Sequence, residues 1–232
     1  MRNPVAVAIA LCYGLAVAAV VGRGRVRKPW FLVAFVLGAI AFPITVLLVN
    51  PIQLLVASAF GWDMEAYSLS VGIGLLGAGI AAAINEIFKL AATLLALSRD
   101  GTEVDAAAFG AAAGAGFGAV GAYQVIALAL MARALQIGTG SLATPLAQQL
   151  GFVAANAAST ALAAYGATHR RLGMFLVAAI LYQTLYGMLA VLFALRVVTL
   201  QAWTLLTVAV ALALLVSAIV LSHRSASPHA TS

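Results

Sequence analysis

Charged residues and cysteine are what this sequence has least of. Only 8% of its 232 residues are charged, and Cys12 is its single cysteine. One cysteine excludes an internal disulfide and a cysteine-based metal site. Because Cys12 lies within the first apolar run, we interpret it as a small residue of the core. The shortage of charge excludes an ordinary soluble domain, since 65% of the residues are hydrophobic.

Long apolar runs take the place of the missing charge. The chain has room for about seven helices of about 20 residues, the length that crosses a bilayer. We therefore expect an all-α, polytopic transmembrane bundle. Residues 1–221 are expected to form one domain, and residues 222–232 a short disordered cytoplasmic tail. The expected spans are residues 4–21, 30–50, 68–97, 105–132, 146–167, 173–195 and 200–221.

Three features predict details of individual spans: the prolines, the length of the apolar runs and the first residues of the chain. Pro43 predicts a kink in the second span, and Pro51 is interpreted as its end. Residues 52–60 then either continue the helix or lie along the membrane interface. The third and fourth runs exceed the thickness of a bilayer, so we expect them to tilt or to extend past it. Arg2 and the apolar run after it resemble a signal peptide, but the run is long enough to span, which favours an anchor helix.

The net charge of +6 is distributed as in a membrane protein and not as in a nucleic-acid-binding protein. The basic residues lie in short loops beside the spans, without interleaved aromatic residues. We expect a multi-pass protein of the cell membrane. The positive-inside rule predicts that the side with more Lys and Arg in its loops is cytoplasmic, which puts the N-terminus outside. The basic residues of that side are Arg23, Arg25, Arg27, Lys28, Arg99, Arg170, Arg171 and Arg224.

Glu86 is the one acidic residue deep within an apolar run, residues 79–90. A carboxylate in the bilayer costs about 2.5 kcal/mol or more unless it is paired or lines a wet cavity. Lys89 follows three residues later and projects from the same side of a helix. We therefore expect Asn85, Glu86 and Lys89 to form a polar cluster, either as a structural ion pair or as a binding site.

Polar residues in other runs extend this candidate cluster. Asn156 and Thr160 are four residues apart and share one helix face. Two interpretations remain open: hydrogen bonds between helices, worth about 0.6 kcal/mol each, or a polar wall facing Glu86. Gln124 and Gln183 are candidates for the same interior. The run that carries Asn156 also contains Gln148, Gln149 and Ser159.

The fourth run is rich in glycine. Gly110, Gly114 and Gly118 have the four-residue spacing that lets helices approach closely, and Gly121 follows. We interpret them as helix-packing residues. A sharper hypothesis is that they bring this helix against the Glu86 helix or leave room for a substrate. The pattern does not favour a phosphate-binding loop, because the glycines lie within an apolar span and not between a strand and a helix.

Three short stretches resemble the intramembrane metalloprotease group that includes the PrsW and YhfC families, relatives of the CAAX-processing proteases. Those families show a Glu-Glu pair with a basic residue three positions later, and residues 85–89 read Asn-Glu-Ile-Phe-Lys. A Gly-x-Gly-Phe segment then leads to a Glu on the next helix, and residues 114–122 match it. A later helix carries a His followed four residues on by Thr or Ser, and residues 156–166 match that.

The departures from this pattern fall at the positions that matter for catalysis. Asn85 replaces the first Glu of the pair, Gly121 the Glu of the next helix, and Asn156 the His. An alternative register puts Ala155 at the His position, which is equally inactive. Carboxylates and imidazole are what such a site needs to hold a metal ion and activate its water. The resemblance therefore implies the fold of the group and argues against its activity, so we expect no catalytic residue, metal or cofactor.

Three functions follow as hypotheses. The favoured one is a non-catalytic binding or scaffold subunit in the lipid bilayer, which holds another membrane protein, a hydrophobic segment or a second copy of the chain. The second is a transporter or channel component that uses Glu86 in a polar pathway. The third is an active intramembrane metalloprotease, although a catalytic zinc wants three protein ligands. The histidines available to it lie in loops or the tail: His169, His223 and His229.

Overall fold

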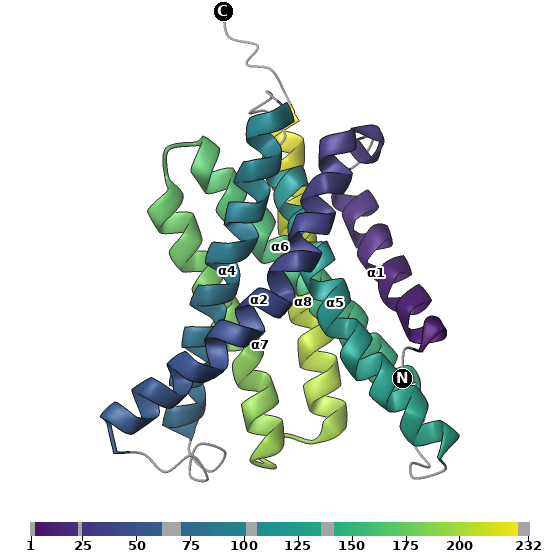
Figure 1. Cartoon of the computed structure of the whole chain (residues 1–232), viewed down its shortest axis with the longest axis vertical. Helices are drawn as coiled ribbons and strands as arrows, with labels where there is room; N and C mark the ends of the chain where they lie inside the picture. The colour runs from purple at the N-terminus through teal and green to yellow at the C-terminus, as the bar shows by residue number, and fades with distance from the viewer. Residues whose placement is uncertain (1–2, 23–24, 62–70, 101–105, 136–141, 227–232) are drawn as a thin grey trace, which may run out of the picture.

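The computed structural model describes residues 3–22, 25–61, 71–100, 106–135 and 142–226 (Figure 1). Within them the chain is an all-α bundle with seven helices, each long and apolar enough to cross a membrane, which confirms the predicted fold class. A short 3₁₀ turn, η1 (Arg25–Arg27), precedes the second helix. The helices are α1 (Pro4–Gly22), α2 (Pro29–Ala59), α4 (Val71–Asp100), α5 (Ala106–Ala134), α6 (Ala143–Thr168), α7 (Leu172–Ala194) and α8 (Leu200–Ala226).

Two predicted boundaries are wrong. The second span does not end at Pro51, because α2 continues to Ala59, which confirms the alternative that the residues after Pro51 continue the helix. Proline removes one backbone hydrogen bond, but in an apolar environment a helix is the one local structure that satisfies the remaining backbone groups. Similarly, α8 extends to Ala226, so residues 222–226 of the predicted tail are helical. Residues 227–232 lie outside the described part of the chain.

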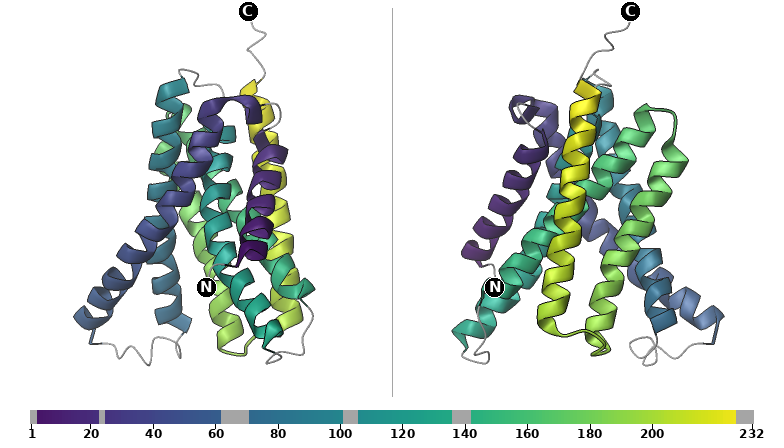
Figure 2. Two further views of the ribbon diagram at one scale, coloured as in Figure 1. Left: turned by 45° about the vertical axis from the view of Figure 1, so that its right-hand side comes forward. Right: turned by 180° about the vertical axis from the view of Figure 1, so that it is seen from behind.

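Helices α5 and α6 form the centre of the bundle. Every residue from Ala106 to Ala119 of α5 is buried, on all sides of the helix. Helices α1 and α2 pack on α5, whereas α7 and α8 pack on α6, and α4 connects the two groups through α2 and α7 (Figures 1 and 2). The small side chains of α5 and α6 allow this double coverage, since they let neighbouring backbones approach closely.

Three glycines of α5 lie against the backbone of α6. A Cβ atom on Gly110 would stand 2.6 Å from the carbonyl oxygen of Thr160, and one on Gly118 would stand 2.8 Å from the Cα of Val153. A Cβ on Gly114 would overlap the backbone of α6 as well. No side chain fits at these positions without moving one helix, so the glycines set the distance between the two central helices.

Other glycines of α5 face α2 and the aromatic residues around it. A Cβ on Gly116 would overlap the carbonyl group of Phe35 in α2. One on Gly121 would stand 2.7 Å from the ring of Phe152 and 2.9 Å from that of Phe42. The glycine faces therefore meet α6 and α2, and not α4, which was the first of the two alternatives in the sharper hypothesis.

Cys12 lies on the outward side of α1 and is exposed, so its interpretation as a core residue is wrong. Helix α1 packs through the buried residues Ala6, Ala10, Gly14 and Ala18, which repeat every four positions along one face. Cys12 falls on the opposite face. In a helix that is apolar all round, polarity alone does not reveal which side packs.

One end of the bundle collects the basic segments. Lys28, which precedes α2, forms an ion pair of 2.8 Å with Asp100 at the last residue of α4. The connection from α6 to α7 and the end of α8 lie at this same end, whereas the first residues of α1 point to the other (Figure 2). The loops that the charge argument assigned to one side of the membrane, Arg25–Lys28, Arg99 and Arg170–Arg171, thus share one end.

Candidate functional site

Glu86 and Lys89 form a closed ion pair inside the bundle. They lie one turn apart on α4, with 2.5 Å between Lys89 Nζ and Glu86 Oε1. Neither side chain has any exposed surface. Taking two charges out of water is expensive, and their attraction offsets the cost only when further hydrogen bonds satisfy the remaining donors and acceptors.

Helix α6 supplies those hydrogen bonds from one face. Lys89 Nζ donates to Asn156 Oδ1 at 2.8 Å, and Ser159 Oγ donates to Glu86 Oε1 at 2.6 Å. Thr160 Oγ1 lies 3.4 Å from the other carboxylate oxygen of Glu86, and its closer acceptor is the backbone oxygen of Asn156 at 2.9 Å. Asn156, Ser159 and Thr160 are spaced by three and four residues, so they project together towards α4.

Helices α7 and α5 complete the enclosure. Gln183 Nε2 of α7 donates to Ser159 Oγ at 2.9 Å and to Asn156 Oδ1 at 3.3 Å. On the α5 side, the ring of Phe117 lies with its centroid 5.1 Å from Lys89 Nζ, a cation–π contact. The network thus ties four helices together and carries no net charge if both residues are ionised.

This arrangement leaves little free coordination capacity. Oε1 of Glu86 accepts hydrogen bonds from Lys89 and Ser159, whereas Oε2 has only the 3.4 Å contact with Thr160 Oγ1. Within the described ranges, no group of three or more His, Cys, Asp or Glu side chains is placed to hold a metal ion. The side-chain oxygen of Asn156 accepts a hydrogen bond from Lys89. A neutral amide is also a poor substitute for the anionic and imidazole ligands that zinc prefers. The geometry therefore suits a structural role better than a chemical one.

Two of the polar residues predicted for this interior, and one other polar residue of the run that carries Asn156, lie elsewhere. Asn85 precedes Glu86 but points to another side of α4, where it lines a pocket. Gln124 is exposed on the outer surface of α5 and does not join the cluster. Gln148 is buried but donates its hydrogen bond to Thr204 Oγ1 of α8 at 2.8 Å. Helix rotation separates these residues, although each lies within an apolar run.

Gln183 joins the network as predicted, and so does Ser159, which the sequence placed only in the same run as Asn156. Ser159 contacts both charges, and Gln183 bonds Ser159 and Asn156 together. The available signal for Ser159 was its three-residue spacing from Asn156. For Gln183 the signal was a single amide in an otherwise apolar helix, which does not say what it faces.

The pocket beside Asn85 lies between α2, α4, α5 and α6 and has a volume of about 130 Å³. Its walls are mostly apolar and include three phenyl rings, with three polar side chains among them. Phe117 belongs both to the pocket and to the contact with Lys89, whereas Glu86 and Lys89 do not line the pocket. The lining residues are Phe42, Thr45, Val46, Val49, Asn50, Ala81, Asn85, Phe117 and Phe152.

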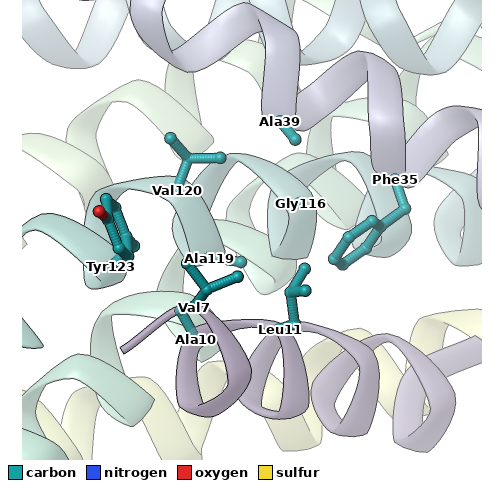
Figure 3. Close-up of a pocket in the computed structure, with 9 residues that line it drawn as sticks. All are labelled: Val7, Ala10, Leu11, Phe35, Ala39, Gly116, Ala119, Val120 and Tyr123. Carbon is teal, nitrogen blue, oxygen red and sulfur yellow. The ribbon is translucent and has the colours of Figure 1, made fainter. Parts of the chain in front are cut away.

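A second pocket, of about 140 Å³, lies between α1, α2 and α5 (Figure 3). Phe35 and Tyr123 stand towards its two ends, and the side chains between them are small or aliphatic. It offers no titratable carboxylate, imidazole or amine. The pocket is an apolar space between packed helices, and its lining does not indicate a particular ligand.

Together, the fold and the site define a multi-helix protein of the membrane-spanning class whose centre holds an enclosed ion pair. No family model, no curated protein and no solved structure matches the chain. The resemblance to the PrsW and YhfC families therefore stays a prediction that rests on the three short stretches of sequence described above.

Proposed function

We propose that this protein is a non-catalytic, multi-pass subunit of the cell membrane that holds a transmembrane segment of another membrane protein. The observation that carries the proposal is the enclosed ion pair. Glu86 and Lys89 use their hydrogen-bonding capacity on each other and on α6. The ion pair thus stabilises the bundle, and the partner would be recognised by the outer surface of the helices.

The second half of α2 is the surface that supports this role best. It leans away from the central helices towards its end (Figures 1 and 2), and several of its large apolar side chains are exposed. Leu47 is 75% exposed and Leu55 is 67% exposed. Apolar exposure alone does not select a partner, because lipid covers any such helix. Asn50 adds an exposed amide to this surface, and an amide on a membrane helix can form a hydrogen bond to another helix.

The alternative functions have weaker support. A transporter that uses Glu86 needs water or a cation to reach it, and Glu86 is wholly buried and lines neither pocket. A metalloprotease of the resembling group needs ligands at Asn85, Gly121 and Asn156, none of which carries a carboxylate or an imidazole.

In the proposed orientation, the N-terminus is outside and the C-terminus is in the cytoplasm.

Photo-crosslinking in native membranes tests the scaffold function. A photoreactive phenylalanine analogue replaces Leu47 or Leu54 on α2, or Leu205 on α8 as a control that is 72% exposed. We expect the α2 positions to yield one protein adduct of constant mass, and Leu205 to yield lipid adducts alone. The same adducts at all three positions, or no protein adduct from α2, would overturn the proposal.

A further inference from the structure

Asn50 and Asn85 line the pocket without using their amide groups. Neither side chain has a hydrogen-bond partner among the residues that the structure describes, whereas Asn156, Gln53 and Gln183 all do. Gln53, on the next turn of α2, donates to the carbonyl oxygen of Gly77 at 2.9 Å. Gln124, Gln149 and Gln201 also have no partner among the described residues, but they do not line the pocket, so Asn50 and Asn85 are the two unpaired amides placed at it.

The depth of Asn85 makes an unused amide costly. Asn85 lies near the middle of α4, about 22 Å along the axis from its last residue at about 1.5 Å per residue. The hydrocarbon core of a bilayer is about 30 Å thick, so the pocket lies where bulk water is scarce. A polar group at that depth without a partner is destabilising, and its natural partner is a polar side chain of a neighbouring helix.

The lining of the pocket restricts which group can enter. No charged side chain lines it, and Glu86 and Lys89 are paired with each other outside the lining. A charged group would therefore enter without a counter-ion. Apolar cavities of about 150 Å³ accept one benzene molecule, so the pocket, at about 130 Å³, has room for one side chain.

Asn50 also belongs to the outward surface of α2. Leu47, Asn50 and Leu54 repeat at three and four residues, so they form one stripe along the helix. All three are exposed, and Asn50 lines the pocket at the same time. A helix packed on this stripe would therefore have the pocket at its edge, within reach of a side chain.

We propose that this pocket receives a neutral amide side chain, asparagine or glutamine, from a transmembrane helix of the partner that packs on the Leu47–Leu54 stripe. An amide offers both donors and acceptors, as do Asn50 and Asn85, so an incoming amide can pair with either or both. The three phenyl rings cover its methylene group. This inference rests on the proposed scaffold function and names the chemistry by which the partner is recognised.

Two synthetic transmembrane peptides test the inference in lipid nanodiscs that hold the full chain. Both are polyleucine helices with a terminal fluorophore, one with a central asparagine and one with leucine there, used at dilutions where neither self-associates. Energy transfer to a labelled protein measures binding. We expect the asparagine peptide to bind about threefold to tenfold more tightly, as one or two hydrogen bonds between membrane helices predict.

Matched variants locate the preference. Asn50→Leu and Asn85→Leu should each reduce it, and Gln124→Leu, which removes an exposed amide elsewhere, should leave it unchanged. Asn50 is exposed, so its variant should fold even if Asn85→Leu does not. Equal binding of both peptides, or a preference that survives both asparagine changes, overturns the inference while leaving the scaffold function standing. If neither peptide binds and crosslinking from Leu47 gives no protein adduct, both proposals fail.

Discussion

Lys89 of α4 donates a hydrogen bond of 2.8 Å to Asn156 of α6, although 67 residues separate them in the sequence. The same ammonium group bonds Glu86 on its own helix. A pair that local helix geometry creates is thus completed by a distant helix. Breaking either part should reveal how much of the stability of the bundle depends on it.

The ion pair predicts a non-additive mutant cycle. Lys89→Met alone strands a buried carboxylate and should lower the free energy of unfolding by about 3–5 kcal/mol. Glu86→Gln/Lys89→Met leaves a neutral site and should cost less than Lys89→Met alone. Unfolding in mild detergent, followed by circular dichroism, measures both. Additive losses over the cycle would argue that the two residues do not interact.

Close packing of α5 on α6 predicts that Gly118 tolerates no large side chain. A Cβ there would already stand 2.8 Å from the Cα of Val153, so Gly118→Leu should cost about 1–3 kcal/mol by overpacking. Gly173→Leu is the matched control, because a Cβ on Gly173 has nothing within 4 Å. Thermal stability in detergent is the readout. If Gly118→Leu melted like its control, the contact would not matter.

Loop charges predict the orientation in the membrane. In a Cys12→Ala background, a cysteine replacing Arg171 should be reached by an impermeant thiol reagent only after the cells are opened. A cysteine replacing Ser58, near the opposite end of the bundle, should react in intact cells. The physical reason is the excess of Lys and Arg retained on the cytoplasmic side. Labelling of the residue-171 cysteine from outside would reverse the topology. The same charge argument predicts that residues 62–65 are external, and they lie outside the described residues.

Ligand chemistry predicts that the purified protein holds no stoichiometric zinc and cleaves no partner. Glu86 is a single carboxylate already engaged with Lys89, and Asn156 is a neutral amide. Elemental analysis, beside a proteolysis assay on crosslinked partners, is the measurement. About one zinc per chain, lost in Glu86→Ala together with a cleavage activity, would restore the enzyme hypothesis.

The number and placement of the helices could be predicted from the sequence, because a bilayer leaves few other ways to satisfy the backbone of an apolar run. The boundaries agree within a few residues for most helices. Pro51 is the largest error: proline is a helix breaker by its local chemistry, but the apolar residues on either side continue α2 through it.

The pairing of Glu86 with Lys89 was also within reach of sequence, since a three-residue spacing places both on one side of any helix. What they face was not. Only the tertiary structure brings Ser159 and Gln183 to them, turns Asn85 into the pocket and leaves Gln124 exposed. The reason is that these helices are apolar on nearly every side, so no stripe in the sequence shows which side packs. Close contacts between small residues set the rotation of each helix, and those contacts exist only once the helices have met.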